Sequence, residues 1–216
     1  MNPFAILLTK VKTTPLPEQF YWDHFNTKLT ENTRDFKEKD YAIYLPKLDN
    51  VQIWLEKWFQ QKVMKDLLII KRTILEDTHL SQDSNLMDFY KLCFARTILD
   101  VSNAVYDGSS THIRKDLQSF SPNTFQAFIA NFREIKGKIR EFTRQTNSKY
   151  VPEIIHNDCN VTMKNLAKPV NTIITSPPYG DEHNTIGYSR WTKFFLYWLD
   201  YTQETVLENR KKTLGG

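Results

Sequence analysis

A short loop, Ser176-Pro177-Pro178-Tyr179, holds the residues with the clearest chemical potential in this sequence. The two prolines fix φ and remove two backbone N–H donors, so we expect a stiff strip of exposed carbonyls. A group carrying an N–H2 could give one hydrogen to the Ser176 hydroxyl and the other to a loop carbonyl. Tyr179 offers a flat face on which a heterocycle could stack. The loop therefore predicts a site for an amine-bearing ring.

The chemistry that such a loop supports is activation of a weak nucleophile. An exocyclic amine conjugated with its ring becomes more reactive when two acceptors hold its hydrogens and localise the nitrogen lone pair. It can then attack an aligned sulfonium methyl by direct displacement, without a covalent enzyme intermediate. The alternative is a plain proline turn between a strand and a helix. Gly180-Asp181 after the loop and Asn157-Asp158 upstream favour the catalytic interpretation.

Two short apolar segments, 151–156 and 171–175, are predicted to be neighbouring strands of a parallel sheet, with a brief helical turn at 160–166 between them. Both segments end in polar residues. In open α/β sheets ligands bind at the carboxyl ends of the strands, so the two loops are expected to form the site.

The rest of the chain is predicted to be mainly helical. Asn2 and Pro3 are typical of a helix start, and the apolar spacing favours helices over 4–12, 50–76, 85–106 and 123–147. Residues 13–49 are rich in Thr, Pro, Asp, Asn and Lys, and we expect a long irregular connection there.

The predicted helix 123–147 is basic on the face opposite its apolar residues. That face carries Arg133, Lys136, Lys138, Arg140 and Arg144. Such a face could follow a phosphate backbone, or it could simply be solvated.

Composition limits the remaining possibilities. The chain has 216 residues, a net charge of +4, 40% hydrophobic residues and 25% charged residues, which is typical of a globular protein. Cys93 and Cys159 form no CxxC pair and the histidines are scattered, so we expect no metal site. The apolar runs are too short to span a bilayer, and the cysteine usage favours a cytoplasmic location.

A family resemblance rests on Thr175 to Asp181, together with Tyr188, Arg190 and Trp198-Leu199. These residues resemble the catalytic motif region of bacterial DNA amino-methyltransferases of restriction–modification type. The resemblance implies an α/β, Rossmann-like fold with a large helical insertion and S-adenosyl-L-methionine as the cofactor. It also implies that Ser176, Pro177, Pro178 and Tyr179 are catalytic and that double-stranded DNA is the substrate.

The first loop residue bears on the target atom. In this family serine there is more usual for cytosine N4 and aspartate for adenine N6, so Ser176 favours cytosine and leaves adenine N6 as the alternative. Enzymes that methylate RNA or protein amides more often have asparagine at this position. Gly180, Asp181 and Arg190 are then expected to brace the loop or contact DNA, as are Lys136, Lys138 and Arg140 on the helix.

The resemblance extends to both sides of the insertion. Ile155-His156-Asn157-Asp158 is similar to the family's strand before the catalytic loop, with Asn157 in place of a glycine, and it implies that Asp158 lies near the cofactor adenine. The stretch from Asn2-Pro3 to Thr14 resembles the segment that follows the cofactor loop, so Asn2 and Pro3 are expected beside the cofactor. The implied organisation is a methyltransferase start at 1–14, a connection and helical insertion at 15–149 and a catalytic part at 150–216.

A glycine-rich cofactor turn is missing from this pattern. The sequence has six glycines, and none of them forms such a turn. We therefore expect a split subunit, a fragment of a longer reading frame or a decayed gene, and the alternative is a cofactor motif of divergent sequence. A second chain could supply the glycine loop and target recognition. The alternative of another class is a non-catalytic DNA-binding or assembly half that works only beside a partner.

Overall fold

The computed structural model describes residues 2–17, 22–106, 111–146, 152–155, 161–162, 171–173 and 188–213. Within these ranges the chain is mainly helical. The helices are α1 (Pro3–Thr13), α2 (Trp22–Arg34), α3 (Val51–Trp58), α4 (Gln61–Glu76), α5 (Thr78–Gln82), α6 (Ser84–Val101), α7 (Thr124–Gln145), α10 (Tyr188–Trp198) and α11 (Gln203–Thr213), with a 3-10 helix η1 (Glu38–Tyr44). The described strands are β1 (Ala104–Tyr106) and β2 (Thr111–Ile113), which pair antiparallel.

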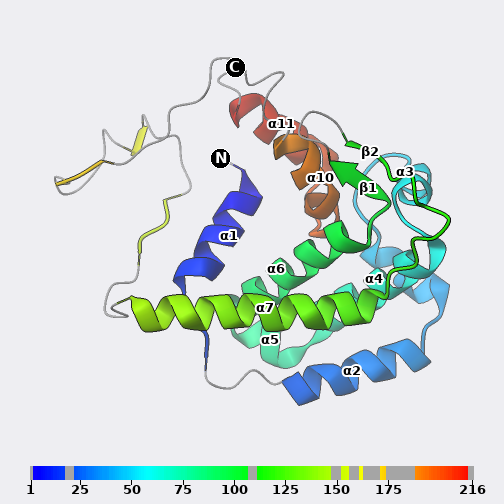
Figure 1. Cartoon of the computed structure of the whole chain (residues 1–216), viewed down its shortest axis with the longest axis horizontal. Helices are drawn as coiled ribbons and strands as arrows, with labels where there is room; N and C mark the ends of the chain where they lie inside the picture. Colours follow the sequence, from blue (N-terminus) through cyan, green and yellow to red (C-terminus); the bar gives the residue numbers. More distant parts are fainter. Residues whose placement is uncertain are drawn as a thin grey trace.

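Helix α6 lies at the centre of the described fold. It contacts α1, α4, α5, α7 and α10. Its side chains Phe89, Cys93 and Ile98 are fully buried. Helix α7 crosses the molecule in Figure 1, with α1 and α10 on one side of it and α2 on the other. The helix-on-helix core therefore joins the first helix, the expected insertion and α10 in one hydrophobic cluster.

Three expected helices form with small changes of boundary. The helix expected at 4–12 is α1, and the Asn2 side chain accepts a hydrogen bond from the Phe4 N–H at 2.9 Å, as the N-cap interpretation requires. The helix expected at 123–147 is α7, which begins after an Asn123 cap. The one expected at 85–106 begins as α6 but ends at Val101, because the chain then turns into β1.

The helix expected over 50–76 is wrong as a single element. It divides into α3 and α4 at Phe59 and Gln60, whose backbones are extended. The Phe59 side chain is 2% exposed, and the Trp58 carbonyl accepts a hydrogen bond from the Asn103 N–H at 2.8 Å. Burial and a bond to a distant residue therefore stabilise the break more than helix propagation would.

The long irregular connection expected at 13–49 is also wrong. Helix α2 and the 3-10 helix η1 lie within it. The sparse apolar residues of α2 include Phe25 and Leu29, which share one face and are buried. This buried face holds the helix because it packs against α4.

The two expected strands at 151–156 and 171–175 do not form over their described parts. Residues 152–155 and 171–173 have no strand structure, and Ile155 and Ile173 are 40% and 63% exposed. A strand needs a hydrogen-bonded neighbour, and neither segment has one among the described residues. The parallel, Rossmann-like sheet therefore stays a prediction.

Candidate functional site

The residues with the clearest predicted chemistry lie outside the described residues. They are Asp158, Ser176, Pro177, Pro178, Tyr179, Gly180 and Asp181. Arg190 falls in α10. The described elements that bear on the predicted site are α1, with Asn2 and Pro3 at its start, and α10, which follows the loop in the chain.

Helix α10 is held by aromatic side chains buried in the body. Phe194 and Trp198 are 0% exposed. Trp198 meets Phe94 of α6 edge to face at 6.1 Å between ring centroids, and Phe194 meets Trp58 of α3 in the same way at 5.0 Å. Edge-to-face pairs of this kind stabilise by more than their buried area alone. The segment after the predicted catalytic loop is therefore fixed to the insertion helices.

The carboxyl end of α10 is closed by an aspartate in a left-handed conformation. Asp200 has φ 67°. The N–H of Tyr201 bonds to the Leu196 carbonyl at 3.0 Å, and the N–H of Asp200 bonds to the Tyr197 carbonyl at 3.2 Å. This is the Schellman pattern, in which the left-handed position usually holds glycine. Asp200 occupies that position here, and its side chain has a further role.

That role is an ion pair with Lys71 of α4. The Lys71 Nζ lies 2.7 Å from Asp200 Oδ1, and Lys71 is only 3% exposed while Asp200 is 32% exposed. Burial lowers the pKa of the Lys71 ammonium, and the hydrogen bond and charge of Asp200 oppose that change. The pair connects residues 129 positions apart and so sets where α10 ends on α4.

The sequence analysis did not predict this ion pair, although the position of Lys71 gave a signal for it. Lys71 follows Leu67 by four residues, so it lies on the apolar stripe of α4 where a lysine is unexpected. Asp200 gives no comparable signal, because an aspartate after a helix is ordinary in a turn.

Helix α1 lies beside α10. The rings of Phe4 and Phe195 are 4.0 Å apart between centroids, with an interplanar angle of 46°. Phe195 is 2% exposed and Pro3 is buried. Two segments about 190 residues apart in the chain, each expected beside the cofactor or the catalytic loop, are therefore brought together.

A cavity between these helices tests the expected cofactor contact. It has a volume of about 150 Å³ and is lined in part by Pro3, Phe4, Leu196 and Leu199. Ligand pockets usually have ~300–1,000 Å³. The Asn2 side chain is engaged as the helix cap. The cavity that the described residues form is too small for S-adenosylmethionine. Cofactor binding by Asn2 and Pro3 therefore stays a prediction.

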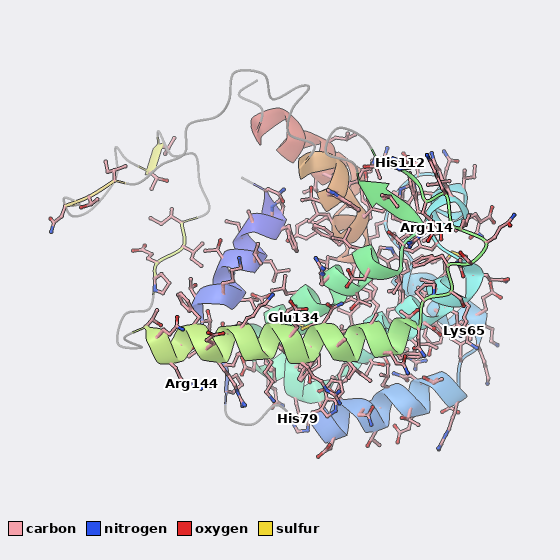
Figure 2. All side chains as sticks on the ribbon, in the orientation of Figure 1. Lys65, His79, His112, Arg114, Glu134 and Arg144 are labelled. Atoms are coloured by element: carbon pink, nitrogen blue, oxygen red, sulfur yellow. The ribbon has the colours of Figure 1, made fainter. Side chains whose placement is uncertain are left out.

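The three α7 residues predicted to contact DNA fall on two different faces. At 3.6 residues per turn, Lys136 and Arg140 lie on one stripe, whereas Lys138 shares a stripe with Glu134 and forms an ion pair with it. Glu134 and Lys138 also line a groove between α7, α1 and α6. Figure 2 shows Glu134 on the α6 side of α7 and Arg144 near the end of the same helix.

The described residues also bear on other kinds of site. No group of three His, Cys, Asp or Glu side chains in those ranges could hold a metal ion. None of the helices described is long and apolar enough to cross a membrane.

Comparison with known proteins supports the resemblance in the sequence. The chain is 27% identical to Type II methyltransferase M.MvaI from Kocuria varians over an alignment of 212 residues that covers 93% of this chain. The match spans 45% of that protein, so the chain corresponds to less than half of this curated relative's length. No protein-family model and no solved structure matches. The chain is thus similar, over most of its length, to part of a Type II methyltransferase.

Proposed function

We propose that this chain is part of a DNA methyltransferase that transfers a methyl group from S-adenosylmethionine to an exocyclic amine of a DNA base. The observation that carries the proposal is the similarity to a Type II methyltransferase. A continuous stretch covering 93% of the chain necessarily includes Ser176 to Tyr179. The loop with the appropriate chemistry therefore lies within the region of similarity.

The chain's own residues supply positioning and polarisation in this reaction. S-adenosylmethionine supplies the methyl group when bound. The Ser176 hydroxyl and a loop carbonyl accept the two amine hydrogens, which localises the nitrogen lone pair. Tyr179 stacks on the base after it leaves the duplex. Each of these contributions needs rigid placement, which the two prolines favour.

The packing of α1 against α10 supports this arrangement. The resemblance implies that Asn2 and Pro3 lie beside the cofactor, and α10 follows the predicted catalytic loop in the chain. The contact between Phe4 and Phe195 brings these two segments together. Cofactor and loop would then meet on the same side of the helical body.

The preferred target is cytosine N4, with adenine N6 as the alternative. Ser176 at the first position of the loop favours cytosine by resemblance. Digestion of methylated DNA to nucleosides, followed by mass spectrometry, distinguishes N4-methylcytosine from N6-methyladenine. Methylated adenosine as the main product would overturn the cytosine assignment and leave the class of reaction standing.

The loop assignment is tested by Ser176→Ala in an active assembly containing this chain. We expect the rate of methyl transfer from tritiated cofactor to fall roughly 10–1,000-fold, because one aligned acceptor is lost. Ser81→Ala, at an exposed position in α5, is the matched control and should retain the wild-type rate. A wild-type rate in Ser176→Ala contradicts the proposed role of the loop.

A further inference from the structure

One stripe of α7 gathers positive charge around a glycine. The α7 basic stripe consists of Arg133, Lys136, Gly137, Arg140 and Arg144. Its four cations are spaced three or four residues apart, and Gly137 lies among them on the same side of the helix. Lys136 is half-buried and the other four positions are exposed. The acidic residues Glu134 and Glu141 fall on the neighbouring stripe. The five positions of the α7 basic stripe are therefore four basic residues and one glycine.

Gly137, in the middle of this stripe, has no packing reason to be glycine. A Cβ added at this position would meet nothing within 4 Å. Glycine inside an exposed helix costs about 1 kcal/mol relative to alanine. Because no described residue of this chain needs the space, the bare backbone leaves room for something outside the chain to approach the helix closely.

The charges of the stripe also repel one another. Burial lowers the pKa of the Lys136 ammonium, and the positive charge of Arg140, one turn away, lowers it further. Like charges separated by four residues destabilise a helix. A polyanion bound along the stripe would oppose this repulsion.

We propose that the α7 basic stripe is a docking surface for the backbone of duplex DNA, with a phosphate approaching the bare backbone at Gly137. The stripe extends about 16 Å from Arg133 to Arg144, at 1.5 Å per residue. Duplex DNA carries one negative charge per ~1.7 Å of axis, so several phosphates lie within this length. The inference rests on the proposed function for the choice of DNA as the polyanion.

Lys138 lies outside this surface and provides the matched control. It is on the same helix but pairs with Glu134 on the side that faces the groove with α1 and α6. Removing its charge changes the net charge of the chain as much as removing any one charge of the stripe. An effect specific to the stripe therefore separates docking from general electrostatic attraction.

The first test measures how the affinity for a mixed-sequence 30-base-pair duplex depends on salt, by fluorescence anisotropy and without cofactor. The triple variant Lys136→Gln, Arg140→Gln and Arg144→Gln should reduce the slope of log affinity against log salt by about 2–3, because each phosphate contact contributes ~0.9. Lys138→Gln should leave the slope nearly unchanged. Equal effects per charge removed from the stripe and from Lys138 would overturn the proposal.

The second test uses Gly137→Leu, which changes no charge. We expect Tm to rise by about 2–3 °C, because leucine favours the helix and nothing blocks it. We expect duplex affinity to fall at least tenfold, because the side chain fills the space for the phosphate. A higher Tm together with a lower duplex affinity excludes misfolding as the cause of the lost binding. Unchanged affinity in a more stable Gly137→Leu chain contradicts the close approach.

The outcomes also separate this inference from the proposed function. Duplex binding that depends on the stripe, without any methyl transfer, supports the docking surface and contradicts the enzymatic proposal. Methyl transfer together with an unchanged salt slope in the triple variant supports the enzymatic proposal and contradicts the docking surface. Binding to anionic vesicles but not to duplex would overturn the choice of partner.

Discussion

The ion pair between Lys71 and Asp200 gives the sharpest prediction about stability. Asp200→Ala removes the partner of an ammonium that is 3% exposed. Breaking a fully buried pair costs about 3–5 kcal/mol. Asp200 is 32% exposed, so water partly compensates, and a cost of about 2–3 kcal/mol is expected for the lost partner. Alanine at φ 67° adds about 1 kcal/mol of backbone strain.

Two further variants separate the charge from the backbone. Asp200→Gly loses the same carboxylate but suits the left-handed conformation, so it should be about 1 kcal/mol more stable than Asp200→Ala. The double variant Lys71→Met with Asp200→Gly removes both charges and fills the space with an apolar chain. We expect it to be as stable as the wild type or more so.

The assay is urea unfolding followed by tryptophan emission, because Trp191 and Trp198 lie in α10, with circular dichroism as an independent probe. The free energy of unfolding comes from linear extrapolation to zero urea. Equal slopes of free energy against urea concentration confirm that the variants have comparable folded and unfolded states. The reasoning is refuted if Asp200→Ala costs less than about 1 kcal/mol, or if Asp200→Gly is no more stable than Asp200→Ala.

The same variant has a predictable pH dependence. Without Asp200, Lys71 loses the hydrogen bond and the charge that raise its pKa, so its folded pKa falls further below the unfolded value. The unfolded chain then binds more protons than the folded chain between these two pKa values, and stability rises with pH in that window. The deficit of Asp200→Ala relative to wild type should therefore shrink as pH rises from neutral towards about 10. A constant deficit would show that the lysine is not the source of the cost.

Three other predictions concern the core, an alkaline titration and the cofactor. Phe195→Ala should destabilise the chain by about 3–5 kcal/mol, because it empties the contact with Phe4, and calorimetric unfolding measures this loss. Burial and the hydrogen bond to Glu76 raise the pKa of Tyr44 to about 12, so the folded chain keeps this proton longer and stability should fall as pH rises from 10 to 12. Tyr44→Phe should flatten that fall in urea titrations at alkaline pH. The 216-residue chain should bind S-adenosylmethionine more weakly than low micromolar, which is about −8 kcal/mol, because its sequence has no glycine-rich turn. Isothermal titration showing low-micromolar affinity would contradict this expectation.

The sequence alone was enough to predict the elements that depend on near neighbours. The Asn2 cap, helix α1 and the length of α7 follow from residue types spaced within a few turns. The Ser176–Tyr179 loop and the chemistry expected of it also come from local sequence, since prolines fix their own backbone. Its placement stays a prediction, because it lies outside the described residues.

Tertiary packing decided the features that local pattern could not. The break at Phe59 depends on a hydrogen bond from Asn103, and α2 forms because its buried face meets α4. The hairpin of β1 and β2 ends a helix that periodicity alone would continue.

The charged residues show most clearly what local sequence predicts and what only tertiary packing decides. Sequence marked Lys136, Lys138 and Arg140 as one basic face, but the fold pairs Lys138 with Glu134 beside the groove. Lys71 and Asp200 meet across 129 residues. The physical reason is that a helix fixes which residues share a face, whereas only the packed chain determines what that face meets.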